Sequence, residues 1–267
     1  MTVPALFRGL FDDAAVFPPG DLPLAEAVPA HLGHRAAAYA DSVGPFLCGA
    51  GLLGELARLA EPGLRVGLVL PGGSDQLVPA LEAASALTVT GVELAATDVR
   101  AAVAALDEHL PKDVWGTVEI PRGASLPDAL DALAGTPYRA KYRTGGLTAE
   151  AFPSERELAA FLAGCAERGL PYKCTAGLHN AVRHTDAVTG FEHHGFLNVL
   201  LAAAEPDRAA ELLAERSGAV LASAAGDLTD TQIADLRRSF TAFGTCSVIE
   251  PLVDLAELGL VPPLENH

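Results

Sequence analysis

Short apolar runs and longer segments with hydrophobic residues at helical spacing alternate along this chain. The short runs are rich in valine, leucine and isoleucine, which is typical of strands buried in a parallel sheet. The longer segments repeat apolar positions every three or four residues, which predicts amphipathic helices. The expected strands span 14–17, 45–48, 64–70, 87–94 and 114–120, followed by runs that contain Lys141 and Lys173. The expected helices span 24–40, 52–59, 76–86, 99–110, 126–133 and 155–168.

Seven strand–helix units in succession favour a (β/α)8 barrel of the TIM type, formed as a single domain over residues 1–267. The eighth unit is irregular, because about seventy residues separate the seventh strand from the apolar segment 243–247. Helical patterns occupy 196–204, 207–215 and 229–238 within this interval. We therefore expect an expanded region after the seventh strand. The alternative architecture is an open doubly wound parallel sheet.

Composition restricts the class of protein. Half of the residues are hydrophobic, which is enough for a sizeable core, and no apolar run approaches the ~20 residues that cross a bilayer. The amino terminus lacks the basic and apolar segments of a secretory leader. The four cysteines are widely spaced, with no Cys-x-x-Cys pair, which indicates reduced thiols. These features predict a cytoplasmic protein.

The charge distribution indicates which partners to expect. The net charge of −16 argues against nucleic acid and anionic membranes, because both bind basic surfaces. Positive charge is nevertheless concentrated between residues 139 and 183. The cationic residues there are Arg139, Lys141, Arg143, Arg156, Arg168, Lys173 and Arg183. A local basic site in an acidic protein suits a small anion such as a phosphate or a carboxylate.

Two lysines are the most informative residues of the chain. Only three lysines stand against fifteen arginines, and Lys141 and Lys173 both lie in short strand-like runs that end in glycine-containing turns. Arginine cannot release its proton in a protein, whereas a desolvated lysine can act as a nucleophile or a base. Alternate strand residues of a (β/α)8 barrel face inward, and its active site forms at the carboxyl ends of the strands. We therefore expect both lysines to point into one cavity.

Carboxylates are expected beside these lysines, because Glu93 and Glu119 lie near the ends of the fourth and fifth strands. Opposite charges within a few ångströms make burial of each group tolerable. This set supports imine chemistry. Burial of Lys141 and the nearby positive charge of Lys173 favour the neutral amine of Lys141, which can then attack a carbonyl. Glu93 or Glu119 would relay protons. The second interpretation is a lysine–glutamate network that only stabilises the barrel.

The lysine motifs carry a family resemblance. Lys-x-x-Thr-Gly at Lys141 and Lys-x-x-x-Gly at Lys173, followed by Phe-Gly-Thr-Cys-Ser at 243–247, resemble segments of deoxyribose-phosphate aldolase and related class I aldolases. The resemblance implies a Schiff-base lysine at Lys141 and a second lysine at Lys173. It also implies a phosphate-binding loop that contains Gly244, Thr245 and Ser247.

A second resemblance covers nearly the whole chain and is to an uncharacterised bacterial protein family. It rests on five motifs: Asp12-Asp-Ala-Ala-Val-Phe-Pro-Pro19, Lys141-x-Arg-Thr-Gly-Gly146, Lys173-x-Thr-Ala-Gly-Leu-His179, His194-Gly-Phe-Leu-Asn198 and Gly244-Thr-Cys-Ser-x-x-Glu-Pro251. Several of these motifs fall at expected strand ends or in the loops that follow them. This resemblance supplies motifs without an activity.

The turns after the sixth and seventh strands supply candidate anion-binding groups. Backbone N–H groups in such turns can point at an anion, and the loops after late barrel strands often bind phosphate. The second interpretation is that the glycines only permit tight turns. The candidates in and beside these turns are Arg143, Thr144, Gly145, Gly146, Thr175, Gly177 and Arg183.

A histidine cluster forms the main alternative site. His179, His184, His193 and His194 lie within sixteen residues after the seventh strand. Such a cluster can ligate zinc, iron or manganese, although no His-x-His or His-Glu-x-x-His pattern is present. We favour His179 as an acid, base or hydrogen-bond donor beside Lys173, without a metal or any other cofactor.

Three further residues admit two interpretations each. Asp12 and Asp13 either contribute a carboxylate to the site or belong to an amino-terminal turn. Cys246 is either a nucleophile with a histidine partner or a small packing residue, and the second is the commoner role of a single cysteine.

The sequence therefore predicts a lyase of the aldolase type. Lys141 would form an imine with a small anionic carbonyl compound, either phosphorylated or carboxylated. The alternatives are a metal-dependent lyase or hydrolase that uses the histidines, and a non-catalytic barrel that binds a small anion. Association into a homo-oligomer remains open.

Overall fold

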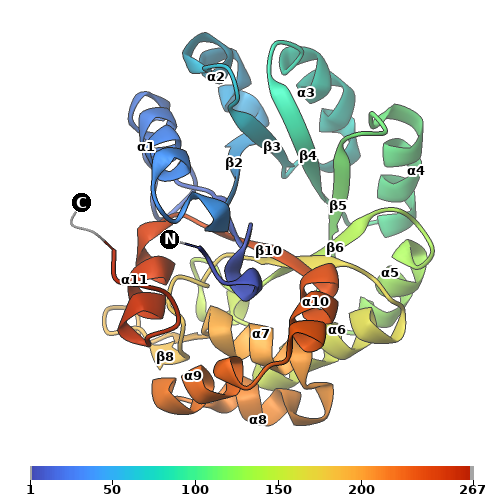
Figure 1. Ribbon diagram of the computed structural model, residues 1–267. Helices are drawn as coiled ribbons and strands as arrows, with labels where there is room; N and C mark the ends of the chain where they lie inside the picture. Colours follow the sequence, from blue (N-terminus) through green and yellow to red (C-terminus); the bar gives the residue numbers. More distant parts are fainter. Residues whose placement is uncertain (1, 265–267) are drawn as a thin grey trace.

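The computed structural model describes residues 2–264. Eight parallel strands form a closed barrel in the order β1-β10-β7-β6-β5-β4-β3-β2, with helices around it (Figure 1). The predicted (β/α)8 barrel is confirmed, and the open doubly wound sheet is wrong. The barrel strands are β1 (Phe11–Asp13), β2 (Val43–Gly49), β3 (Arg65–Leu70), β4 (Thr88–Ala95), β5 (Trp115–Glu119), β6 (Arg139–Arg143), β7 (Tyr172–Thr175) and β10 (Phe240–Thr245).

Helices connect successive strands along the outside of the barrel. They are α1 (Leu24–Ala36), α2 (Leu53–Leu59), α3 (Leu77–Ala83), α4 (Val99–His109), α5 (Leu126–Leu133) and α6 (Glu155–Glu167), with α11 (Ile249–Glu257) after the last strand. Short 3-10 turns lie at Ala5–Phe7, Ala40–Ser42, Ala50–Leu52, Gly73–Gln76, Ala149–Ala151 and Pro206–Arg208. The sequence predicts a single domain over residues 1–267. Residues 1 and 265–267 lie outside the described residues, so this single domain stays a prediction.

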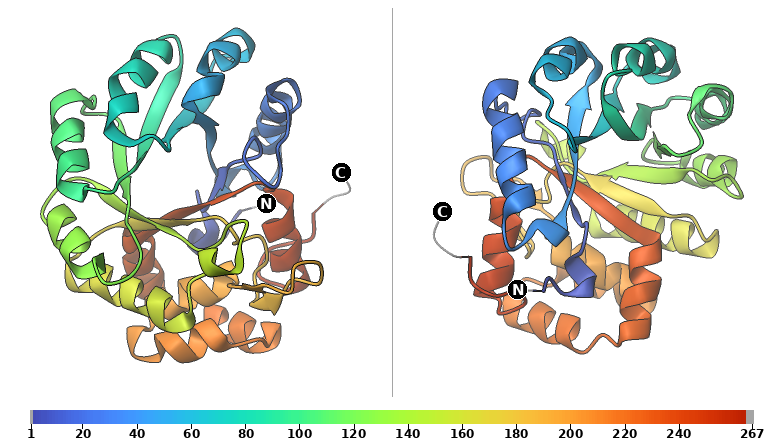
Figure 2. Two further views of the ribbon diagram at one scale, coloured as in Figure 1. Left: turned by 180° about the vertical axis from the view of Figure 1, so that it is seen from behind. Right: turned by 45° about the horizontal axis from the view of Figure 1, so that its top comes forward.

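The connection between β7 and β10 is expanded, as predicted. It holds an antiparallel pair, β8 (His184–Thr185) and β9 (Glu192–His193), followed by α7 (Phe196–Ala204), α8 (Ala209–Ala214), α9 (Gly218–Gly226) and α10 (Asp230–Ser239). These helices gather on one side of the barrel (Figure 2), where α7 contacts α8, α9 and α10. The sequence did not predict α9, because its run of small residues shows no helical alternation of apolar and polar positions.

Local sequence explains where several helices begin. The side chain of Asp98 accepts a backbone hydrogen bond in the first turn of α4. Ser154 and Glu157 form a capping box at the start of α6, and Thr229 and Gln232 form another at α10. Each cap satisfies backbone N–H groups that have no partner within the helix.

The first strand is not where the sequence predicts it. Residues 14–17 form a turn, in which the N–H of Phe17 donates to the carbonyl of Ala14, and β1 lies three residues earlier. Two consecutive aspartates are unusual in a strand. Here Asp12 contacts Lys173 inside the barrel, while Asp13 accepts a hydrogen bond at 2.9 Å from His31 of α1. Tertiary partners thus override local propensity.

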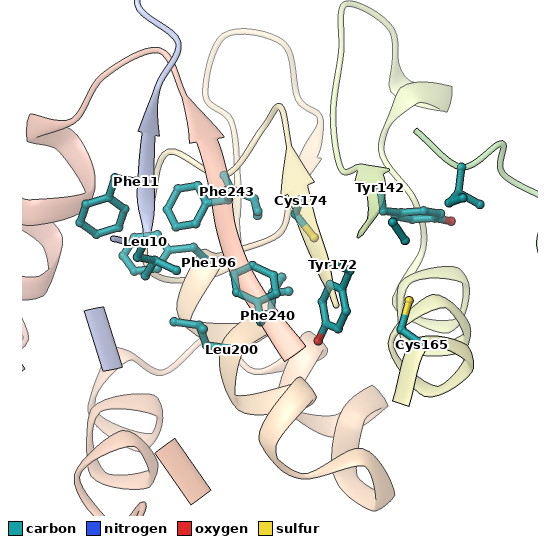
Figure 3. Packing of buried hydrophobic residues seen from close by; sticks show 14 of the residues in the cluster. Leu10, Phe11, Tyr142, Cys165, Tyr172, Cys174, Phe196, Leu200, Phe240 and Phe243 are labelled. Atoms are coloured by element: carbon teal, nitrogen blue, oxygen red, sulfur yellow. The ribbon is translucent and has the colours of Figure 1, made fainter. Parts of the chain in front are cut away.

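Aromatic side chains fill the layer between the strands and the helices (Figure 3). Phe11 and Phe243, on the paired strands β1 and β10, pack against Phe196 of α7 with ring centroids 5.2–5.9 Å apart. Tyr142 stacks on Phe161 of α6 at 4.3 Å. Successive residues of a strand point to opposite faces of the sheet. The residues that precede and follow these aromatics in the strands therefore point into the barrel. Within the described residues, no helix has the length and apolar character needed to cross a membrane.

Candidate functional site

The two lysines face each other across neighbouring strands inside the barrel. Lys141 of β6 and Lys173 of β7 are partners in the parallel register, and Glu119 of β5 is the partner of Lys141 on its other side. The lysine side chains are only 5% and 4% exposed. Their strand neighbours Tyr142 and Cys174 belong to the outer aromatic layer (Figure 3). The lysine side chains are therefore buried charges, and each requires compensation.

Glu93 compensates both lysines at once. Its Oε1 lies 2.5 Å from Nζ of Lys173, and its Oε2 lies 2.7 Å from Nζ of Lys141. Lys173 also contacts Oδ2 of Asp12, which closes the buried end of the network. Oε2 of Glu93 is held by its ion pair with Lys141, and it is the one buried side-chain nitrogen or oxygen of residues 2–264 without a hydrogen bond of ordinary geometry.

The network continues outward through Glu119. Its Oε2 lies 3.1 Å from Nζ of Lys141, and its Oε1 accepts a hydrogen bond of 3.1 Å from Nε of Arg143. Exposure rises along this path, because the Glu119 side chain is 21% exposed and that of Arg143 is 48% exposed. Solvent exposure therefore rises from the buried lysines through Glu119 to Arg143.

The alternating charges control the protonation of the buried groups. Burial alone would raise the pKa of Glu93, but the charges of Lys141 and Lys173 outweigh it and lower that pKa to about 2. Burial opposes the charged form of Lys173 as well, yet Asp12 and Glu93 raise its pKa well above the usual value. Lys173 is consequently a permanent ammonium, and Glu93 is a permanent carboxylate at neutral pH.

The pKa of Glu119, the carboxylate nearer to solvent, is lowered as that of Glu93 is. Burial acts to raise the pKa of Glu119, but the charges of Lys141 and Arg143 lower it below the usual glutamate range. At the inner end, burial raises the pKa of Asp12 against the opposing charge of Lys173. Glu119 is therefore the ionised carboxylate nearest to solvent.

Asp12 joins the network, although the sequence leaves it open between a site carboxylate and an amino-terminal turn. Its position depends on Gly44, because a Cβ atom at that residue would lie 2.1 Å from Oδ1 and 3.3 Å from Cα of Asp12. A glycine in the second strand opposite a strand aspartate is the local signal for this placement. The tertiary contact with Lys173, 161 residues away in sequence, decides it.

A cleft of about 440 Å³ opens beside the network. It lies between the loops that follow β3, β4 and β5, and Glu119 forms part of its wall. The other ionisable residues of the wall are Asp75 and Asp98. The ionisable residues of this wall are thus all acidic.

The turns after β6 and β7 are packed against each other. Thr144 is buried, and its hydroxyl donates to the carbonyls of Thr175 and Ala176. A Cβ atom at Gly145 would lie 2.9 Å from the Cα of Gly177, which itself has a φ of +75°. These glycines are required for close backbone approach, as the tight-turn interpretation states. Gly146 lies in the same turn, where a Cβ atom would meet Ala151.

The remaining anion-binding candidates lie in two other places. Arg183 forms ion pairs with Glu155 and Glu192 at 2.8 and 3.1 Å, which neutralise its charge. Gly244 and Thr245 end β10, and the hydroxyl of buried Thr245 donates to the carbonyl of Ser247. This segment lies at the mouth of the barrel, next to the start of α11.

The four histidines do not form one cluster. His184 and His193 pack ring against ring in the β8–β9 pair, with centroids 5.1 Å apart. His194 is buried, and its Nε2 lies 2.7 Å from the carbonyl of Pro153. Nδ1 of His179 lies 2.8 Å from a carboxylate oxygen of Glu250, and within residues 2–264 His179 makes no contact with Lys173. Within that range, no group of three histidine, cysteine, aspartate or glutamate side chains is arranged to hold a metal ion.

Comparisons with known proteins find likenesses of fold only. No protein-family model and no curated protein matches the chain. The carboxyl transferase domain of Rhizobium etli pyruvate carboxylase, solved with pyruvate and biocytin, is 14% identical at a TM-score of 0.42 over 94% of this chain. The chain spans about half, 51%, of that domain's length. A monomeric dihydrodipicolinate synthase variant is 12% identical at a TM-score of 0.40, over 96% of this chain and 98% of that one.

Proposed function

We propose that the protein is an enzyme that forms an imine between Lys141 and a small carbonyl compound. The reaction class is an aldol-type cleavage or formation of a carbon–carbon bond, or a related isomerisation. The observation that carries this proposal is that Nζ of Lys141 contacts two carboxylates, those of Glu93 and Glu119. One of them, Glu119, also lines the cleft.

Glu119 is positioned to relay a proton between Lys141 and solvent. Its Oε2 lies 3.1 Å from Nζ, and its partial exposure allows the proton to pass on to water in the cleft. The neutral amine then attacks the carbonyl carbon, so that a C–N bond forms and the carbonyl oxygen leaves as water after accepting two protons. The product is an iminium ion, which withdraws electrons from the adjacent carbon and promotes cleavage or deprotonation there.

Lys173 is suited to electrostatic stabilisation rather than attack. Asp12 and Glu93 hold its ammonium group and keep it protonated. A fixed positive charge beside Lys141 stabilises the negative charge that develops on the carbonyl oxygen during attack. The protein has already oriented this charge, so no reorganisation is needed at the moment of reaction.

Arg143 is the proposed contact for an anionic end of the substrate. Its Nε donates to Glu119 and its side chain is 48% exposed, so the guanidinium group can be reached from solvent. A planar guanidinium binds carboxylate and phosphate groups through paired hydrogen bonds. The substrate would thus place its carbonyl at Lys141 and its anionic group at the mouth.

Borohydride trapping tests this proposal. The protein is incubated with a panel of small aldehydes, ketones and sugar phosphates, reduced with borohydride, and analysed by intact mass and peptide mapping. We expect a reduced adduct on Lys141 that is absent in Lys141→Arg, because arginine keeps the charge but cannot form an imine. Lys112→Arg is the matched control, since Lys112 is exposed before β5 and should leave the adduct unchanged.

Other outcomes would redirect the assignment. An adduct that maps to Lys173 would reverse the roles of the two lysines. No adduct, together with a stoichiometric transition metal in the purified protein, would favour the histidine-based alternative. Binding of a small anion with neither adduct nor metal would favour a non-catalytic binding protein.

A further inference from the structure

Cys246 differs from the other cysteines of the chain. Cys48, Cys165 and Cys174 are buried in the hydrophobic core, whereas Cys246 is partly exposed in the segment that follows β10. The carboxyl ends of the strands form the face of a barrel on which reactive groups are placed. Cys246 is therefore the cysteine of residues 2–264 with access to a small molecule.

His179 contacts both this thiol and the carboxylate of Glu250. Sγ of Cys246 lies 3.5 Å from Nε2 of His179, and Nδ1 of the same ring lies 2.8 Å from Oε2 of Glu250. With Nδ1 engaged by the carboxylate, Nε2 is the nitrogen that can take the thiol proton. Sγ is also 3.7 Å from Nδ1, so the sulfur is nearly equidistant from the two ring nitrogens, and the ring must turn before Nε2 points at the thiol. Such loose contacts are common before a substrate binds.

Burial, with the nearby carboxylate of Glu250, keeps the thiol of Cys246 protonated in the resting state by raising its pKa. Backbone hydrogen bonds from Gly20 and from Cys246 itself act to lower the pKa of the thiol. Burial and Glu250 act more strongly in the opposite direction, and the pKa of Cys246 is raised to about 11. The resting state is thus a protonated thiol beside an imidazole. Such a pair needs proton transfer to the histidine during attack, as serine does in a hydrolase triad.

We propose that Cys246, His179 and Glu250 form a second, nucleophilic site that accepts the acyl group of an ester or thioester. Two segments bring these residues together: His179 follows β7, whereas Cys246 follows β10 and Glu250 lies just beyond it in the first turn of α11. The site is separate from the lysine network in the contacts of the described residues, and it does not depend on imine formation at Lys141.

The acyl transfer requires neither an oxidant nor a cofactor. Sγ forms a bond to the acyl carbon while its proton moves to Nε2 of His179. The bond to the alcohol or thiol leaving group then breaks, and His179 returns the proton to that group. Water adds to the thioester with His179 again as the base, which releases a carboxylic acid and restores the thiol. Glu250 orients the ring and stabilises the imidazolium formed in each step.

Acylation by 4-nitrophenyl acetate at pH 7 tests the site. We expect a rapid release of nitrophenol, together with one acetyl group on Cys246 that neutral hydroxylamine removes, as it does from a thioester but not from an amide. Cys246→Ala should abolish this label. His179→Asn should slow it by about 100-fold or more, in line with general-base contributions. Glu250→Gln should slow it less, because the ring remains but loses its orienting charge.

Glu257→Gln is the matched control for Glu250, because Glu257 is exposed at the other end of α11. This variant should acylate at the wild-type rate, and thermal unfolding should show that all variants are folded. Equal labelling of Cys246 in the wild type and in folded His179→Asn would overturn the proposal, since the thiol would then react without its base. Labelling confined to lysine amides would overturn it as well.

Discussion

Lys141 on β6 and Lys173 on β7 lie opposite each other in the strand register, and their ammonium groups meet at a single carboxylate, that of Glu93. Two buried cations side by side would repel each other strongly in a medium of low dielectric constant. Glu93 accounts for the stability of this arrangement, since it contacts both ammonium groups. The neighbouring carboxylates Asp12 and Glu119 each contact only one of them.

Glu93→Gln should destabilise the protein more than any other single change in the network. The amide keeps the shape of the side chain but leaves two buried ammonium groups facing each other. Removal of one member of a buried ion pair costs about 3–5 kcal/mol. Urea unfolding at pH 7, followed by circular dichroism, measures this loss. Exposed Glu61→Gln is the control and should change the free energy of unfolding by less than about 0.5 kcal/mol. A similarly small change in Glu93→Gln would contradict the bridging role.

Acid should weaken the fold through the same carboxylate. The pKa of Glu93 is about 2 in the folded protein against a reference of 4.5, so its contribution is present above about pH 4.5 and is lost as the pH falls towards 2. At about 1.4 kcal/mol per pH unit of difference, the full contribution is about 3 kcal/mol. We therefore expect the gap in unfolding free energy between wild type and Glu93→Gln to shrink between pH 5 and pH 3. Denaturant titrations across this range measure the gap, and a constant gap would show that Glu93 does not supply it.

Gly44→Ala should displace the side chain of Asp12, which lies on the neighbouring strand. The added methyl group would lie 2.1 Å from a carboxylate oxygen that contacts Lys173, so either the aspartate or the strand must move. Overpacking of this kind costs about 1–3 kcal/mol. Gly54→Ala is the matched control, because nothing lies within 4 Å of the added atom and the residue is in α2. That variant should gain up to about 1 kcal/mol, since alanine favours a helix over glycine. Thermal unfolding of the two variants should therefore shift in opposite directions.

Glu119→Gln should lower the rate of imine formation without lowering the stability of the fold. Glu119 is the partly exposed carboxylate next to Lys141, so its loss removes the proposed proton acceptor while the Glu93 contact remains. We expect the rate of imine trapping on Lys141 to fall about 100-fold, with little change in the unfolding midpoint. Glu82→Gln, an exposed change on α3, should trap at the wild-type rate. An unchanged rate in Glu119→Gln would exclude this residue as the proton acceptor.

Much of the barrel can be predicted from alternating patterns. The helices 126–133 and 196–204 coincide with α5 and α7, because each carries a strong apolar pattern. The strand predicted at 14–17 was wrong, because these residues form a turn and the first strand is Phe11–Asp13, in which two of the three residues are acidic. The last strand also begins earlier than predicted, at Phe240, where Tyr172 of β7 is its register partner. A strand begins and ends where an adjacent strand offers backbone partners for pairing. The local sequence does not reveal where those partners lie.

The sequence by itself determined the fold class and the choice of Lys141, Lys173, Glu93 and Glu119, because alternation within a strand dictates which side chains point inward. Only the tertiary structure decided how these charges are paired, that Asp12 joins them, and that His179 lies beside Cys246 and Glu250 instead of beside Lys173. The physical reason is that each contact joins residues from different strands or loops. Their separation is set by closure of the barrel and the packing of its loops, whereas sequence periodicity specifies only the face of one element.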